Sequence, residues 1–133
     1  MKQVTFKEKY PVFTLEILKT ETEFSGTNEI ISYFQEKIIA HPVAVFISLF
    51  DHFSHTKNLE ISGKGGEISP EILDAQNIVF CFGKELPSAL VLAVRPRSIG
   101  VAEFSDKFII SFMETPNPVA TTTVESWIKN LVK

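Results

Sequence analysis

The segment Asp51–His55 holds the densest cluster of chemically capable side chains in the sequence. His52 and His55 are three residues apart, so they would share one face of a helix but point to opposite faces of a strand. Imidazole is a common zinc ligand, and a complete site needs three or four ligands, to which Asp51 or His41 could contribute. One hypothesis is therefore that the protein is a metal-dependent protein or enzyme that uses His52 and His55. The alternative is that this segment is simply the solvent-exposed end of a strand.

A second candidate is the pair Arg95 and Arg97, which flank a proline at the end of a predicted strand. Guanidinium groups bind carboxylate or phosphate through two parallel hydrogen bonds. The alternative is that these arginines pair with acidic residues of the same chain, such as Glu103 or Glu114. We therefore predict an anion or ligand site at Arg95 and Arg97, unless these arginines are already paired with acidic residues of the chain.

The other reactive groups lack a supporting pattern. Cys81 lies in the middle of a predicted strand, and no base is placed near it, so we expect an unreactive thiol. Ser54–Lys57 matches the S-x-x-K pattern of serine acylases, but the accompanying S-D-N and K-T-G elements are absent. Gly63–Gly66 lacks the strand and helix that flank a phosphate-binding loop. These patterns indicate no catalytic residue, and the cofactor is unknown.

A sheet is expected to position these groups. β-Branched, aromatic and other large apolar residues recur with a period of two in Ile78–Phe82, Leu90–Val94 and Phe108–Met113, and Gly and Pro interrupt the runs. The whole block Asn77–Glu114 predicts four successive strands, with a tight hairpin at Phe104–Phe108.

The rest of the chain predicts further elements in this order: a strand at Pro11–Leu18, a helix at Asn28–Ala40, a strand at Val43–Phe53, a short strand at Asn58–Ser62, a short helix from Ser69 to near Gln76, and a helix at Val119–Val132. Val43–Phe53 is apolar on both faces, which is typical of a central strand covered on two sides. Asn117 and Pro118 are typical of a helix start. Trp127, the only tryptophan, lies on the apolar stripe of the last helix and should anchor it.

Strands that follow one another, with helices before and after them, favour an α+β fold. We predict one domain over residues 1–133: a two-layer sandwich with a mostly antiparallel sheet of about six or seven strands. One helix from the N-terminal half and the C-terminal helix should pack on this sheet.

Composition narrows the function classes. The net charge of −3 argues against nucleic-acid binding, and no apolar run is long enough to suggest a signal peptide or a membrane span. The single cysteine excludes an internal disulfide, so a cytoplasmic protein is expected. The 12 phenylalanines belong in a core, in an apolar pocket or at a subunit interface.

The block from Asn77 to Phe104, the ending FIISFMETPNP and the closing helix resemble a small uncharacterised family of bacterial cytoplasmic α+β proteins of unknown function. This resemblance implies no established activity. The element order also resembles the helix-grip lipid-binding architecture, which would imply a closed cavity as an alternative fold. Our leading hypothesis is a small non-enzymatic binding or interaction domain with a Phe-rich apolar pocket or dimer interface. Its partner would be a second copy of itself or a small apolar ligand, and neither nucleic acid nor a membrane.

Overall fold

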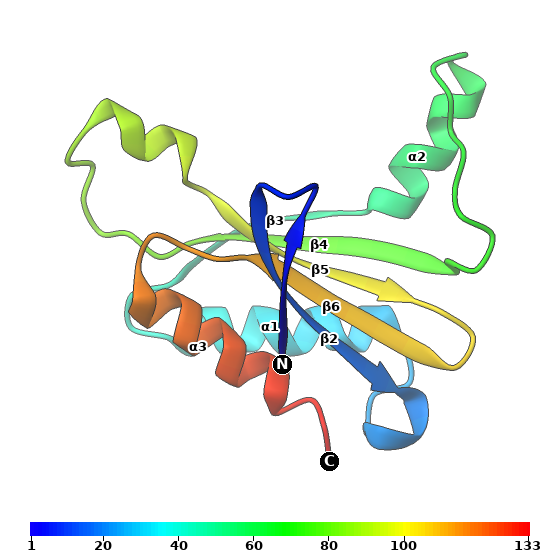
Figure 1. Ribbon diagram of the computed structural model, residues 1–133, viewed down its shortest axis with the longest axis horizontal. Coiled ribbons are helices and arrows are strands. Elements are labelled where there is room, and N and C mark those ends of the chain that lie inside the picture. Colours follow the sequence, from blue (N-terminus) through cyan, green and yellow to red (C-terminus); the bar gives the residue numbers. More distant parts are fainter.

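The computed structural model describes residues 1–133 and contains one six-stranded antiparallel sheet and three α-helices (Figure 1). In chain order the elements are β1 (Lys2–Phe6), β2 (Tyr10–Leu18), η1 (a 3₁₀ turn, Lys19–Glu21), α1 (Thr27–Ala40), β3 (Val45–Phe50), α2 (His52–Ile61), β4 (Asp74–Cys81), η2 (a 3₁₀ turn, Ala89–Ala93), β5 (Arg97–Glu103), β6 (Lys107–Met113) and α3 (Pro118–Lys129). The strand order is β1-β2-β6-β5-β4-β3, and every neighbouring pair is antiparallel. The predicted α+β class is confirmed.

The two long helices, α1 and α3, lie side by side on the same face of the sheet (Figure 1). On the other side, the tip of the β1–β2 hairpin, α2 and the segment around η2 project away from the sheet (Figure 1). No helix in the structure combines the length and the apolar character needed to cross a bilayer.

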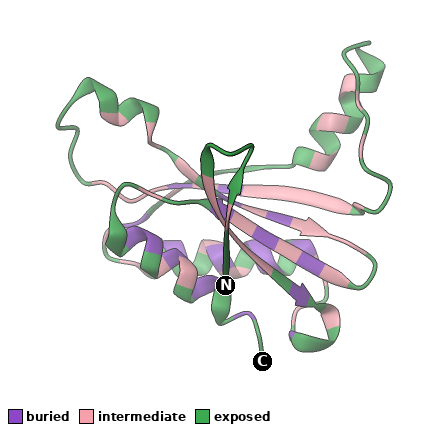
Figure 2. Ribbon diagram, in the orientation of Figure 1, coloured by how far each residue is buried: buried purple, intermediate pink, exposed green.

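The core lies between the sheet and the two helices, where the buried positions gather in Figure 2. Buried residues of β2, β4, β5 and β6 point to this layer, because side chains alternate between the faces of a sheet. It consists of 17 buried residues: Ile17, Ile30, Ile31, Phe34, Ile38, Ala44, Ile78, Phe80, Ile99, Val101, Phe108, Ile110, Phe112, Val124, Trp127, Ile128 and Leu131. The architecture is the predicted two-layer sandwich, with the sheet on one side of this core and α1 and α3 on the other.

The closing helix α3 begins where the sequence predicts. The Asn117 side chain accepts a hydrogen bond from the backbone N–H of Val119 at 3.0 Å, and Pro118 is the first helical residue. The predicted apolar stripe is buried, and Trp127 is only 8% exposed. The tryptophan ring packs against Phe82, with 6.1 Å between ring centroids.

The start of α1 is capped from a distant strand. Its N-cap residue is Gly26, which has no side chain, and Glu103 at the end of β5 takes over the role. One carboxylate oxygen of Glu103 accepts hydrogen bonds from the Thr27 backbone N–H at 3.1 Å and the Thr27 hydroxyl at 2.9 Å, and the other pairs with Lys19 at 2.9 Å. Burial alone would raise the pKa of Glu103, but the hydrogen bonds from Lys19 and Thr27 outweigh it and lower this pKa below its ordinary value.

We expect Glu103→Gln to lower the free energy of unfolding at neutral pH by about 1 to 2 kcal/mol, because an ion pair is lost at the capped helix start. A carboxyl group whose pKa is lower in the folded state stabilises that state above its unfolded pKa. This contribution is lost as the pH falls through the folded pKa. Urea unfolding at neutral pH and near pH 4 should show a smaller pH dependence for the variant than for the wild type.

Glu16→Gln is the matched control, because Glu16 pairs with Lys107 at 3.1 Å but its side chain is 55% exposed. An exposed ion pair contributes at most about 1 kcal/mol, so this variant should stay close to the wild type. Equal losses in the two variants would contradict the capping role of Glu103.

Residues 52–61 are a correction to the sequence prediction. They form α2 instead of a solvated strand end followed by a short strand at Asn58–Ser62. Asp51 caps this helix by accepting a hydrogen bond from the Ser54 backbone N–H at 3.0 Å. No residue of α2 is buried, so it carries no apolar stripe that a periodicity argument could detect.

Two further predictions of elements are wrong, and one strand was missed. Leu90–Val94 lies in the 3₁₀ turn η2, with Leu90 82% exposed, and is not a strand. The short helix from Ser69 to Gln76 is absent: the chain makes a single turn, in which Ile72 N–H bonds the Ser69 carbonyl at 3.0 Å, and β4 then begins at Asp74. Strand β1 was not predicted at all, since its sequence KQVTF has only two large apolar residues.

The strand predicted to be central, Val43–Phe53, is also different in the structure. The observed strand β3 is shorter and lies at one edge of the sheet. Five of its six residues are exposed.

Candidate functional site

A hollow of about 270 Å³ lies at the end of the sheet where β4 finishes and β5 begins. The η2 segment forms one wall, and the start of α3 forms another. Its lining consists of Phe80, Phe82, Gly83, Val91, Val94, Arg95, Arg97, Thr115, Pro116, Asn117 and Ala120. We call it the end pocket.

Strand register and side-chain alternation build this site. Phe80 of β4 is paired with Arg97 of β5, and Phe80 is buried in the core that the helices cover. Phe82 follows two residues later and stacks at an angle on Phe80, with centroids 6.2 Å apart. Val91 and Val94 of the η2 segment close the apolar side. The walls are thus mainly apolar, with the two predicted arginines among them.

Arg97 is half-buried and has only a partial set of partners. One guanidinium nitrogen donates a hydrogen bond to the backbone carbonyl of Glu114, and Nε is buried with no partner. Burial lowers the pKa of Arg97, because the charged form loses contact with water. No carboxylate compensates for the charge.

Arg95 lies beside Gly83. Its Nη1 donates to the backbone carbonyl of Glu85, and its guanidinium occupies the space that a Cβ atom on Gly83 would fill. The glycine therefore gives the guanidinium its place in the pocket wall.

Neither arginine belongs to an ion pair. The ion pairs of the chain are Lys19–Glu103, Lys107–Glu16 and Lys129–Glu125. Glu103 thus has another partner, and Glu114 offers Arg97 only its backbone carbonyl. The alternative considered from the sequence, internal pairing with these two acids, is not found.

The start of α3 adds positive potential to the same pocket. Thr115, Pro116 and Asn117 belong to the lining, and the first turn of the helix contains no acidic residue. The N-terminal end of a helix carries a partial positive charge. Three sources of positive potential, two guanidinium groups and one helix end, therefore converge on a mainly apolar hollow.

A second hollow, of about 330 Å³, lies on the face of the sheet that α1 and α3 leave uncovered. The strand register places Asn77, Gly100 and Ser111 in one row across it. Its lining is more polar than that of the end pocket, and its aromatic residues are Phe80, which lines both hollows, and Phe112. It offers hydrogen bonds but no free charged group besides Arg97.

His52 and His55 come together on the first turn of α2, with 6.4 Å between ring centroids, and both pack against Phe50. Asp51 is occupied as the helix cap, accepting bonds from the Ser54 backbone and hydroxyl. No group of three or more His, Cys, Asp or Glu side chains is placed to hold a metal ion. The structure brings the two predicted metal ligands onto one helix face without a third.

His41 lies at the opposite end of β3 and belongs to another environment. Its Nδ1 accepts hydrogen bonds from the backbone N–H groups of Val43 and Ala44 at 3.0 and 3.2 Å. Its ring contacts Phe82 and Trp127, with centroids 4.8 and 5.9 Å away. His41 therefore packs behind Phe82, one of the aromatic residues that line the end pocket.

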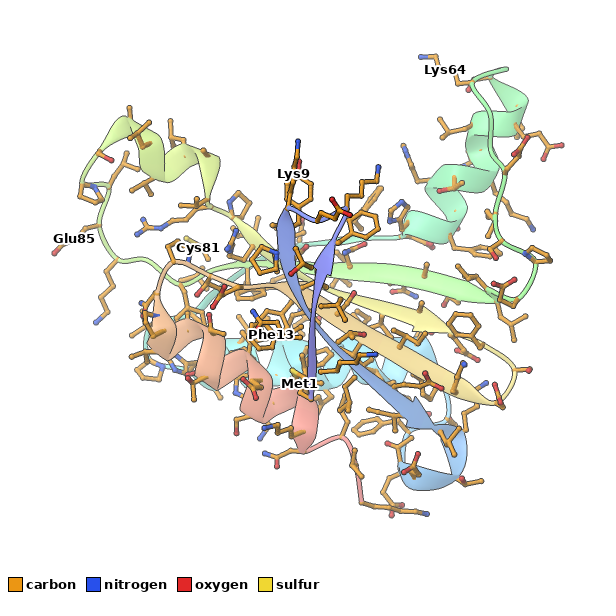
Figure 3. The ribbon with its side chains drawn as sticks, in the orientation of Figure 1. Met1, Lys9, Phe13, Lys64, Cys81 and Glu85 are labelled. Carbon is orange, nitrogen blue, oxygen red and sulfur yellow. The ribbon has the colours of Figure 1, made fainter.

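Cys81 lies at the end of β4, near the base of the η2 segment, while Glu85 marks the outer bend of that segment (Figure 3). The Cys81 thiol is half-buried, and its one partner is the Gly83 carbonyl at 4.0 Å. No hydrogen bond joins this thiol to a basic side chain.

Sequence reasoning identified the arginines but missed the apolar walls around them. Val91 and Val94 were assigned to a strand, and the contact between Phe82 and His41 joins residues 41 positions apart in the chain. The only sequence signal for an irregular segment was the pair Pro87 and Pro96, because proline interrupts strands.

Comparison with known proteins identifies the family of the chain but assigns it no activity. No curated protein and no solved structure matches the chain. The model of a family of unknown function, DUF6858, matches residues 1–133. The expectation of an uncharacterised family is thereby confirmed, and the chain belongs to DUF6858.

Proposed function

We propose that this protein is a small cytoplasmic, non-enzymatic binding protein whose end pocket holds a small amphipathic anion. The apolar part of the ligand would lie against Phe80, Phe82 and the η2 segment. Its carboxylate or phosphate group would bind Arg95 and Arg97. The observation that carries this proposal is that both guanidinium groups line an apolar hollow without a carboxylate partner.

The energetic argument starts from Arg97. Burying a charged group is costly unless it is paired and hydrogen-bonded, and its Nε is buried with no partner. A bound anion would supply the missing charge and a hydrogen-bond acceptor, and guanidinium groups suit the planar oxygens of carboxylate and phosphate. The same anion would relieve the repulsion between the two neighbouring cations.

The pocket volume limits the size of the ligand. About 270 Å³ is slightly below the usual range for ligand pockets, so a ligand of about ten non-hydrogen atoms is appropriate. At about 0.5 kcal/mol per atom, such a ligand would bind with a dissociation constant of roughly 0.1 to 1 mM. Octanoate and octyl phosphate are suitable probes of the two head groups.

Isothermal titration of the full-length protein tests the proposal. We expect octanoate or octyl phosphate to bind, and octanol and octylammonium to bind at least about tenfold more weakly, because they lack the negative charge. The phosphate and carboxylate arms identify which head group the arginines prefer. Equal binding of octylammonium, or no binding of either anion at millimolar concentration, would contradict the proposal.

Two variants locate the binding. Arg97→Gln should weaken the anion at least about tenfold, since it removes a charge-assisted hydrogen bond worth about 1.5 to 3 kcal/mol. Gly83→Ala should weaken it by displacing the Arg95 guanidinium, without straining the backbone. Lys64→Gln is the matched control: it also removes one positive charge, but it lies at the far tip beyond α2 (Figure 3) and should leave the affinity unchanged.

A further inference from the structure

The edge strand β3 has a sequence suited to the interior of a sheet. Residues 42–50, PVAVFISLF, contain no charged side chain, and the nearest charges are Lys37 and Asp51. Apolar residues occupy both faces of the strand, a pattern typical of strands covered on two sides. In this chain alone, Val45, Ile47 and Leu49 are 59%, 48% and 49% exposed.

The opposite edge of the same sheet differs. Strand β1 contains Lys2 and polar residues, and Lys7 and Lys9 follow in the turn next to it. Lysine at an edge strand opposes pairing with another chain, because its charge would be buried. Only one edge of the sheet is thus protected by charge.

The unpaired backbone of β3 can form hydrogen bonds with another β-strand. The side of this strand that faces away from β4 has no neighbouring strand. Its free N–H and C=O groups fit another extended strand, and two copies of one strand can pair in antiparallel fashion about a two-fold axis. A bulge at Ile47 interrupts the regular pairing of β3 with β4. The strand-to-strand pairing would therefore be short, and side chains on both faces would supply most of the buried area.

The exposed area is consistent with such a partner. The chain exposes 8231 Å², whereas a compact monomer of 15.0 kDa would expose about 7,000 Å². The projecting segments and the uncovered edge both contribute to this excess of about 1,200 Å². An excess of this sign is expected where one edge of the sheet lacks its partner, and a standard interface would cover about 800 Å² on each copy.

We infer that β3 is the interface of a homodimer, in which the β3 strands of two copies pair antiparallel and extend the sheet across the two-fold axis. Ile39, on the last turn of α1 and six residues before β3 in the chain, is a further large apolar residue with a mostly exposed side chain, at 64%. Because residues 42–50 carry no charge, pairing of the two strands brings no like charges together within the interface. This inference does not depend on the end pocket.

Sedimentation velocity of the full-length protein between about 1 and 200 µM tests the inference, a range that covers interfaces of ordinary size. We expect the wild type to approach twice the 15.0 kDa mass of one chain. Leu49→Lys should raise the dimer dissociation constant at least about tenfold, since each interface would bury two lysines. Leu90→Lys changes a residue that is 82% exposed on η2 and should remain dimeric.

Hydrogen exchange of the wild type provides a readout independent of any variant. Amides of residues 45–50 should become more protected as the protein concentration rises, while those of β1 should not. A wild type that remains monomeric over the whole range would overturn the inference. A dimer that Leu90→Lys disrupts and Leu49→Lys leaves intact would do so as well.

Discussion

Replacing Trp127 with alanine is expected to lower the free energy of unfolding by about 3 to 5 kcal/mol, the usual range for emptying a large aromatic site. Trp127 is 8% exposed, and its ring packs against both Phe82 and His41, so it joins α3 to the end of β4 and to the loop after α1. Its backbone carbonyl also accepts the hydroxyl of Tyr33 of α1 at 2.7 Å. The substitution would remove the side chain that connects these elements.

Urea unfolding followed by circular dichroism measures this effect. The protein concentration must be the same for both proteins, because dimerisation would shift the unfolding midpoint. Val119→Ala is a suitable control on the same helix, since Val119 is 69% exposed and should change stability by less than about 0.5 kcal/mol. A loss below about 1 kcal/mol for Trp127→Ala, or a fully red-shifted emission of the wild-type tryptophan, would show that the ring is not the anchor.

Phe34→Ala is expected to have an effect of the same size, about 3 to 5 kcal/mol. Phe34 is fully buried at the centre of α1, and its ring contacts Tyr33 at 5.4 Å in an edge-to-face arrangement. Removing it would leave a cavity between α1 and the sheet. The Phe34→Leu variant, which keeps much of the volume, should lose less.

The surface residue Phe6 supplies the comparison for this prediction. Its side chain is 57% exposed on β1, so Phe6→Ala should change the unfolding free energy only slightly. Chemical unfolding of the three variants at one protein concentration would place Phe34→Ala well below the others. Similar stabilities for Phe34→Ala and Phe6→Ala would contradict the assignment of the core.

The elements that sequence reasoning predicted well are those whose apolar stripe meets the core. In α1 the residues Ile30, Ile31, Phe34 and Ile38 are all buried, and α3 shows the same agreement. Such stripes can be read from the sequence because burial follows the helical period. Strand β6 alternates buried and less buried residues for the corresponding reason.

Where an element does not contact the core, the spacing of its apolar residues does not predict its secondary structure. The helix α2 has no buried residue, and its only sequence signal was the cap formed by Asp51 and Ser54. The alternation of Leu90 and Leu92 suggested a strand, yet both are exposed and the segment is a 3₁₀ turn. Short apolar runs do not distinguish between these states by period alone.

The two arginines of the candidate site could be predicted from the sequence, but the residues that surround them could not. Arg95 and Arg97 stood out because two guanidinium groups flank one proline. Whether they pair with Glu103 or Glu114 depends on contacts between distant strands, which periodicity does not determine. The capping of α1 by Glu103 is such a contact, joining residues 76 positions apart, and it removes that acid from reach of the arginines.

The most direct measurement is a ¹H–¹⁵N NMR titration of the full-length protein with octanoate. Our account predicts that amide shifts concentrate at the non-proline residues of 80–83, 95–97 and 115–120, which surround the end pocket. Arg97→Gln should reduce these shifts at a given octanoate concentration. Shifts centred on His52 and His55, or on the uncovered face at Asn77 and Ser111, would contradict the account.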